Sequence, residues 1–179
     1  HPACGPDGSH RCYLGSIVGS MTSMKVSVSL PEDDVEFLDS YASRGDPTAT
    51  ERIEAIYAKH RKAPGSPELA ARALRALAAS KGAAIHPTLL EAVLHPDARV
   101  RLVAADLLPY ADAFTPEIEA AVRGLLADES ATIRQVTAMR AGAARRVGLV
   151  ASLIPLLADP RLRTRHVAAV ALEAATGQK

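Results

Sequence analysis

Apolar residues recur at helical spacing along most of the chain from residue 49 onward. In residues 116–126 they form one stripe, because apolar positions three or four apart share a helix face. Residues 86–94 and 149–157 show the same spacing, so three helices are predicted. Pro155 lies inside the last segment and should bend or restart its helix. The stripes consist of Leu89, Leu90, Val93 and Leu94, of Ile118, Val122, Leu125 and Leu126, and of Leu149, Leu153, Ile154 and Leu157.

Each of these segments leads into a stretch with a shared order of residue types: a polar turn, a β-branched residue, an arginine and an Ala-rich apolar run. The stretches read LHPDARVRLVAADLL, ADESATIRQVTAMRA and ADPRLRTRHVAAVAL. Their arginines stand at positions 101, 134 and 165, at spacings of 33 and 31 residues. Such a period predicts stacked helix–turn–helix units, since one hairpin cannot bury its apolar stripe alone.

A more divergent unit precedes these three. The segments ERIEAIYAKHR and PELAARALRALAAS stand one period before the first helix and the first arginine stretch. Residues 49–79 are therefore predicted to form a first hairpin, and Thr48 with Glu51 has the pattern of a capping box at its start. Residues 46–179 are thus predicted to form one repeat domain of three to four hairpins.

Residues 24–45 carry a different pattern. The strict alternation in KVSVSL predicts a short β-strand with one apolar face. Pro31 ends this strand and suits the first turn of a helix, whose start the acidic run EDD favours. We expect that helix to end at Gly45 and Pro47. The chain is therefore predicted to be mostly α, with one short strand before its first helix.

Composition agrees with close-packed helices and narrows the classes of function. Apolar residues make up 48% of the chain and aromatic residues only 3%, so Ala and Leu supply most of the core. The net charge of +1 gives no strong field that would attract nucleic acid or a membrane. No apolar run approaches the roughly 20 residues of a membrane span. Both cysteines precede residue 13, which is consistent with a reducing cytoplasm.

Residues 1–23 have no periodicity and are rich in Gly, Pro and Ser, so we expect a disordered tail. Four potential zinc ligands lie there, but their H-x2-C-x5-H-x-C spacing does not fit the knuckles of structural zinc sites. These ligands are His1, Cys4, His10 and Cys12. No phosphate-binding, dinucleotide-binding, zinc-protease or nucleophile motif occurs. We therefore predict a non-enzymatic protein without catalytic residue, metal or cofactor.

The repeated stretches resemble HEAT repeats of the bacterial type that also occurs in phycobilin-lyase-like proteins, over residues 49–177. The resemblance implies an α–α superhelix and a polar ladder, in which an Asp that closes the first helix pairs with an Arg of the second. His95 stands at the first Asp position, with Asp97 nearby as a substitute. The expected pairs are Asp128 with Arg134 and Asp159 with Arg165. The residues assigned to this structural role are Arg101, Asp128, Arg134, Asp159 and Arg165.

The opening MKVSVSLPEDDVEFLDSYA, residues 24–42, resembles the start of ribbon-helix-helix proteins, which include bacterial antitoxins and small repressors. The resemblance implies that two copies pair their strands and insert the ribbon into the major groove of DNA. By position, Lys25, Ser27 and Ser29 would contact base edges. The match fades afterwards, because acidic residues stand where the family's second helix would hold a phosphate.

Arg140, Arg145 and Arg146 form a local basic cluster, which fits either a solvated helix end or a docking site for an acidic partner. The leading interpretation is a cytoplasmic, bacterial-type scaffold that binds another protein through a concave row of second helices. The alternative is a dimeric DNA-binding regulator or antitoxin. In that case residues 25–30 would read double-stranded DNA, and the repeats would bind a partner or effector.

Overall fold

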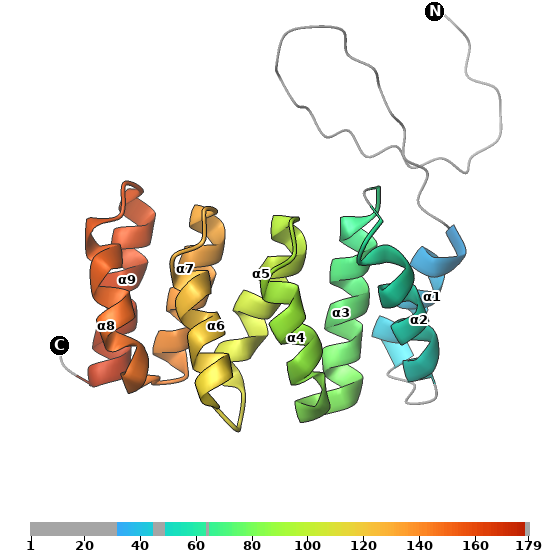
Figure 1. Cartoon of the computed structure of the whole chain (residues 1–179), viewed down its shortest axis with the longest axis horizontal. Coiled ribbons are helices and arrows are strands. Elements are labelled where there is room, and N and C mark those ends of the chain that lie inside the picture. The colour runs from blue at the N-terminus through green and yellow to red at the C-terminus, as the bar shows by residue number, and fades with distance from the viewer. Residues whose placement is uncertain (1–31, 45–48, 64, 178–179) are drawn as a thin grey trace, which may run out of the picture.

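The computed structural model describes residues 32–44, 49–63 and 65–177, which form helices joined by short turns (Figure 1). No β-strand occurs within these ranges. The predicted strand at residues 25–30 and the predicted tail lie outside them. The α-helices are α1 (Glu32–Arg44), α2 (Thr50–His60), α3 (Pro67–Lys81), α4 (His86–Val93), α5 (Ala98–Leu107), α6 (Pro116–Leu126), α7 (Ala131–Ala143), α8 (Val150–Leu153) and α9 (Leu162–Thr176).

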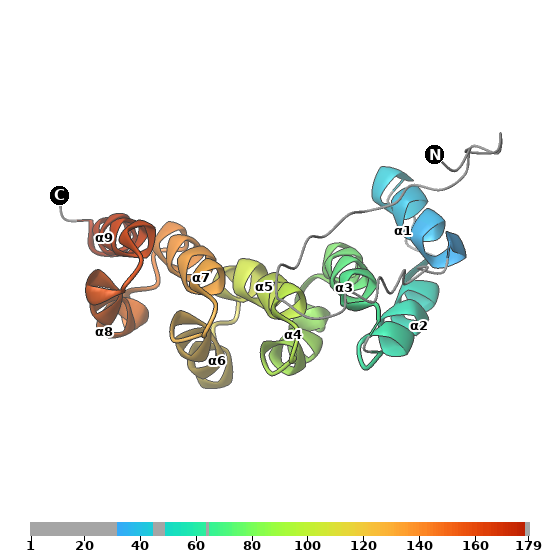
Figure 2. The same cartoon turned by 90° about the horizontal axis from the view of Figure 1, so that it is seen from above.

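The helices from α2 onward pair into hairpins that stand side by side in one row (Figures 1 and 2). The hairpins are α2–α3, α4–α5, α6–α7 and α8–α9. Their first helices form one layer, and their second helices, preceded by α1, form the other. The second layer bows gently, so that its exposed side lies inside the curve (Figure 2). The prediction of a mostly helical fold is thereby confirmed.

Local sequence signals explain where several helices begin. Pro67 and Pro116 occupy the first turn of α3 and α6, where a missing N–H removes no helical hydrogen bond. Asp97 caps α5, and its carboxylate accepts a hydrogen bond from the backbone N–H of Arg99. Thr115 caps α6 in the same way through its hydroxyl. Pro67 and Asp97 thus mark where the second helices of the first and second hairpins begin, and Thr115 with Pro116 marks the start of the third hairpin.

Proline and glycine set two helix ends as predicted. α1 ends at Arg44, directly before Gly45. α8 ends at Leu153, and the chain continues as a 3₁₀-helix over Ile154–Ala158. Pro155 explains this change, because it has no N–H to donate to the preceding turn of an α-helix.

The divergent unit predicted at residues 49–79 is a hairpin of α2 and α3. Burial of Ile53 and Ile56 holds α2 in this hairpin. The capping box predicted for Thr48 and Glu51 stays a prediction, because Thr48 lies outside the described residues.

The core runs between the two layers through all the hairpins. Leu74, Leu89, Val122 and Leu149 come from different hairpins, and each is almost fully buried. α1 continues this core at one end of the row, because its Leu38 and Tyr41 are buried against the helices of the first hairpin. The described part of residues 24–45 is therefore packed onto the repeat hairpins.

α7 and α9 meet at Gly142 and Ala171. A Cβ atom at position 142 would lie 2.6 Å from the Cα of Ala171, which is closer than real Cβ atoms approach. Because the neighbouring atom belongs to the backbone, the two helices would have to move apart. The spacing of these helices therefore requires glycine at position 142.

We expect Gly142→Ala to lower the free energy of unfolding by about 1–3 kcal/mol, because the added methyl group overpacks the α7–α9 contact. Gly124→Ala is the matched control, since a Cβ there meets nothing within 4 Å on α6. The control should raise the free energy by about 0.5–1 kcal/mol through helix propensity. Urea unfolding followed by circular dichroism measures both. Equal effects would contradict the close contact.

Candidate functional site

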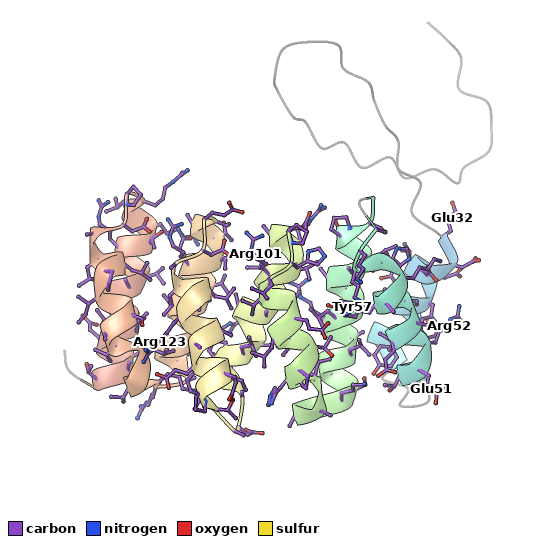
Figure 3. All side chains as sticks on the ribbon, in the orientation of Figure 1. Glu32, Glu51, Arg52, Tyr57, Arg101 and Arg123 are labelled. Carbon is purple, nitrogen blue, oxygen red and sulfur yellow. The ribbon has the colours of Figure 1, made fainter. Side chains whose placement is uncertain are left out.

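Arg101 joins the second hairpin to the third. Its Nε donates to one carboxylate oxygen of Asp128 at 2.8 Å, and its Nη2 donates to the other at 3.1 Å. Nη1 donates to the carbonyls of His95 and Pro96 in its own turn. The Asp128 hydrogen bonds raise the pKa of Arg101. Figure 3 shows Arg101 between the two hairpins, so one guanidinium fixes a turn and a joint together.

Arg134 repeats this geometry at the next joint. Its Nε donates to Asp159 at 2.8 Å, and Nη1 donates to the carbonyls of Asp128 and Glu129. Arg165 donates through Nη1 to the carbonyls of Asp159 and Pro160. No carboxylate in the described part of the chain pairs with Arg165.

The expected pairing of the ladder needs a correction. The carboxylate of Asp128 pairs with Arg101 of the preceding hairpin, not with Arg134. Likewise, the carboxylate of Asp159 pairs with Arg134. Within one hairpin each arginine reaches only the backbone carbonyl of the aspartate. The reason is geometric: the carboxylate also accepts the N–H two residues ahead, which turns it toward the neighbouring hairpin.

The first joint lacks this pair on both sides. Arg101 stands four residues after the N-cap of α5, and Ala70 occupies the same position in α3. In the facing turn, His95 replaces the aspartate. Its Nδ1 accepts from the N–H of Asp97 at 3.0 Å, and its Nε2 donates to the carbonyl of Arg61 at 2.6 Å. A neutral imidazole therefore performs both hydrogen-bonding tasks without a charge partner.

The prediction that Asp97 substitutes for the missing aspartate is wrong. Its carboxylate caps α5 and pairs with the side chain of Arg99. The Arg99 side chain is the main cause that lowers the pKa of Asp97. His95 itself takes over the joint, which sequence spacing alone could not show.

An open cleft of about 790 Å³ lies at this first joint. Several of its ionisable groups are engaged in structural pairs: Arg61 with Glu91 at 2.6 Å, and His95 with two backbone groups. Burial raises the pKa of the Tyr57 hydroxyl at the cleft wall. The described contacts thus tie these groups to the scaffold. The lining residues are Tyr57, Arg61, Lys62, Ala63, Pro67, Glu91, Leu94, His95, Pro96 and Asp97.

A polar relay attaches α1 to the first hairpin. Asp34 accepts from Lys59 Nζ at 2.8 Å and from His60 Nε2 at 2.9 Å. The Lys59 hydrogen bond, followed by that of His60, lowers the pKa of Asp34 despite its partial burial. On the other side of the ring, His60 Nδ1 lies 2.5 Å from the Ser66 hydroxyl.

Asp34, His60 and Ser66 are linked in the order of an Asp–His–Ser catalytic triad. The burial of this group favours a structural role. Ser66 is only 6% exposed and His60 only 4%, so a substrate cannot reach the hydroxyl without local opening. Ser66 stands at the N-cap of α3, yet its side chain does not cap the helix. The hydroxyl instead satisfies the buried imidazole, and the relay positions α1.

The structure separates the three arginines of the expected docking cluster. Arg140 pairs with Asp106 at 2.6 Å and lies over the ring of Tyr110. Arg146 donates to the carbonyls of Pro109 and Ala111 and lies 4.3 Å from the ring centroid of Phe114. Arg145 is exposed, with a φ of 50°. Two of the three therefore brace the joint between the second and third hairpins.

The inner face is the exposed side of α3, α5, α7 and α9, which points away from the first-helix layer. On α7, Gln135 and Gly142 face α9, and Arg140 faces α5. Met139 is left on the remaining side and is 48% exposed. The inner face includes Glu68, Arg72, Arg75, Ala79, Arg99, Asp106, Tyr110, Thr132, Val136, Met139, Ala143, Arg163, Val167, Val170 and Ala174.

One half of the inner face is apolar. Tyr110, Met139 and Val170 are 44%, 48% and 50% exposed. Ala143 and Ala174 are exposed one helical turn beyond Met139 and Val170. Together these five residues form the apolar patch. The sequence pattern did not reveal it, because Met139 and Val170 lie within the Ala-rich apolar runs, whose buried and exposed positions the pattern did not separate.

Several predictions of site residues are not tested by this structure. The DNA contacts proposed for Lys25, Ser27 and Ser29 lie outside the described residues, as do the four potential zinc ligands. Within the described ranges, no group of three or more His, Cys, Asp or Glu side chains could hold a metal ion. Of the helices described, none combines the length and apolarity needed to cross a membrane.

Comparisons with protein-family models, curated proteins and solved structures find no match to this chain.

We expect Arg101→Met to lower the free energy of unfolding by about 3 kcal/mol, because it leaves the buried Asp128 carboxylate without its partner. Arg165→Met is the matched control. It occupies the same helix position but loses only hydrogen bonds to its own turn, so it should cost about 1 kcal/mol. Urea denaturation at neutral pH gives both values. Similar losses of unfolding free energy in the two variants would show that the Arg101–Asp128 pair contributes no stability beyond the hydrogen bonds within the turn.

The lowered pKa of Asp34 predicts that its stabilising contribution is present above about pH 4 and is lost as pH falls through the folded-state pKa. Asp34→Asn should therefore destabilise the chain at neutral pH and flatten the acid limb of its stability profile. Asp33→Asn is the control, since Asp33 is exposed in the same helix turn. Thermal unfolding from about pH 7 to pH 2 tests this. A parallel acid limb in the Asp34 variant would contradict the assignment.

Proposed function

We propose that the chain is a non-enzymatic scaffold of HEAT-like repeats that binds another protein through its inner face. The apolar patch is the observation that carries this proposal. Tyr110, Met139 and Val170 are large apolar side chains, each about half exposed on neighbouring helices. Large apolar side chains exposed on one face of neighbouring helices favour an interaction site. Aromatic and Met side chains are enriched at the centres of protein interfaces.

The rigidity of the surrounding helices supports the same function. α7 and α9 are set at a close distance by Gly142, and α5 and α7 are joined by Arg140 and Arg146. A patch on helices held this way is pre-organised, so a partner loses less free energy on binding through ordering of the surface.

Charge at the edges of the patch adds a preference for an acidic partner. Arg140 is neutralised by Asp106, but Arg75 and Arg163 form no ion pair with the described residues. Both belong to the inner face. A partner with an apolar centre and acidic rim residues would complement this face.

The alternative of a DNA-binding regulator retains one supporting observation: α1 begins at Glu32, directly after the segment that resembles the ribbon. The packing of α1 favours the scaffold. Leu38 and Tyr41 are buried against the first hairpin of the same chain, so a ribbon-helix-helix dimer would first have to expose them. We therefore place the scaffold first.

We expect Met139→Glu and Val170→Glu each to weaken partner binding by about tenfold or more, because a charge enters the apolar centre of the interface. Ile154→Glu is the matched control: Ile154 is 53% exposed but belongs to the first-helix layer. The measurement is quantitative affinity capture with the full chain, after circular dichroism has shown that all three variants fold. Capture that falls equally in all three variants would remove the inner face as the site.

A further inference from the structure

α1 is attached in a different way from α7 and α9. The joints from α5 to α7 and from α7 to α9 use buried arginine–aspartate pairs, and α7 and α9 also meet in close backbone contact at Gly142. The contacts described for α1 include neither kind. It lies along the first hairpin, beside α3 (Figure 2).

The contacts of α1 have the form of an amphipathic helix bound to a receptor. Leu38 and Tyr41 are buried, at 3% and 7% exposure, and Val35 and Phe37 pack partly buried beside them. All of these lie within two helical turns, so they form one apolar stripe. The stripe faces the first hairpin and supplies the non-polar part of the contact.

In each ion pair described around this stripe, the acidic residue belongs to α1 and the basic residue to the first hairpin. Asp34 of α1 pairs with Lys59 and His60, and Asp39 of α1 pairs with Arg72 of α3. The helix is acidic at each ion pair, and the first hairpin is basic.

A cation–π contact completes the arrangement. The guanidinium of Arg52 lies 4.0 Å from the ring centroid of Phe37. The surface of α2 and α3 that contacts α1, called the groove below, therefore has cationic side chains around an apolar centre. An acidic helix with an aromatic side chain on its apolar stripe complements both features.

We propose that this surface of α2 and α3 is a docking site for an acidic amphipathic helix of a partner protein, and that α1 occupies it in the free chain. One polar contact of α1, the Asp39–Arg72 pair, is exposed enough to exchange, whereas the Asp34–His60 pair is largely buried. The Asp39 and Arg72 side chains are 61% and 34% exposed, and exposed ion pairs contribute little to stability. Competition with α1 then makes the affinity of a partner depend on its match to the groove.

The site is distinct from the inner-face patch, because the two use different residues at different parts of the row. Docking at α2 and α3 depends on Arg72 and on the groove for Leu38 and Tyr41, whereas the patch depends on Met139 and Val170. Either proposal can therefore fail while the other holds.

The test uses a fluorescein-labelled peptide with the sequence of residues 32–44, EDDVEFLDSYASR, titrated with the full chain. In the released-helix variant, Leu38→Ala with Tyr41→Ala, α1 loses its buried anchors. We expect this variant to bind the peptide at least about tenfold more tightly than the unaltered chain, because the tethered competitor is gone. Fluorescence anisotropy gives both dissociation constants, and circular dichroism confirms the fold.

Charge reversal identifies the groove. Arg72→Glu in the released-helix variant should weaken peptide binding by about tenfold, and a peptide with Asp39→Arg should recover most of that loss. If the released-helix variant does not fold, Asp39→Arg in the full chain replaces it, because that change alters an exposed pair. Equal affinity of the released and unaltered chains overturns the proposal, and so does a reversed pair without recovery.

Light scattering of the unaltered chain tests whether α1 of a second copy occupies the groove. A monomer supports a partner protein's helix as the second occupant. A dimer that dissociates on Asp39→Arg would assign the groove to α1 of a second copy and would overturn the assignment to a partner protein.

Discussion

The row of hairpins depends on a guanidinium group that binds in two directions. Arg101 and Arg134 each hold two carbonyls of their own turn and an aspartate carboxylate of the next hairpin, and Arg101 also binds the carboxylate of Glu129. A hydrogen bond to a carbonyl fixes the turn, and a charged pair at low exposure fixes its neighbour. Turn geometry and hairpin stacking are thereby coupled, so neither can change alone.

The first joint shows what happens when this coupling is removed. Ala70 stands where the later hairpins have an arginine, so no guanidinium is present at this position. His95 stabilises the turn through the hydrogen bond that its neutral ring accepts from the N–H of Asp97. The joint then opens into a cleft, because no buried arginine–aspartate pair spans it. The charged pairs that do span it, Arg61 with Glu91 and Arg99 with Glu68, are exposed. The two changes agree with each other: an aspartate at position 95 would face no arginine and would be a poorly compensated charge near the core.

Rigid joints and exchangeable contacts are distributed unevenly along the row. The C-terminal half combines Gly142, Arg134 and Arg146, and it carries the apolar patch. The N-terminal end holds α1 through the exposed Asp39–Arg72 pair, the largely buried Asp34–His60 pair and one short apolar stripe. We therefore assign a pre-formed binding face to the first region and an exchangeable one to the second.

Helix positions were predictable because their signals are local. The apolar period, Pro116 and Gly45 act within one or two turns, and Pro155 ended α8 where expected. The arginines of the ladder were identified from their spacing, but their carboxylate partners were displaced by one hairpin.

The sequence by itself determined the hairpins, their order and the residues that could form joints, since these follow from periodicity and turn chemistry. Only the tertiary structure decided which groups meet. Arg101 and Asp128 are 27 residues apart, and Asp34 and His60 are 26 apart, so their contacts depend on how hairpins stack. The same holds for Met139 and Val170: helical spacing places them on a face, and only packing shows which faces neighbours cover.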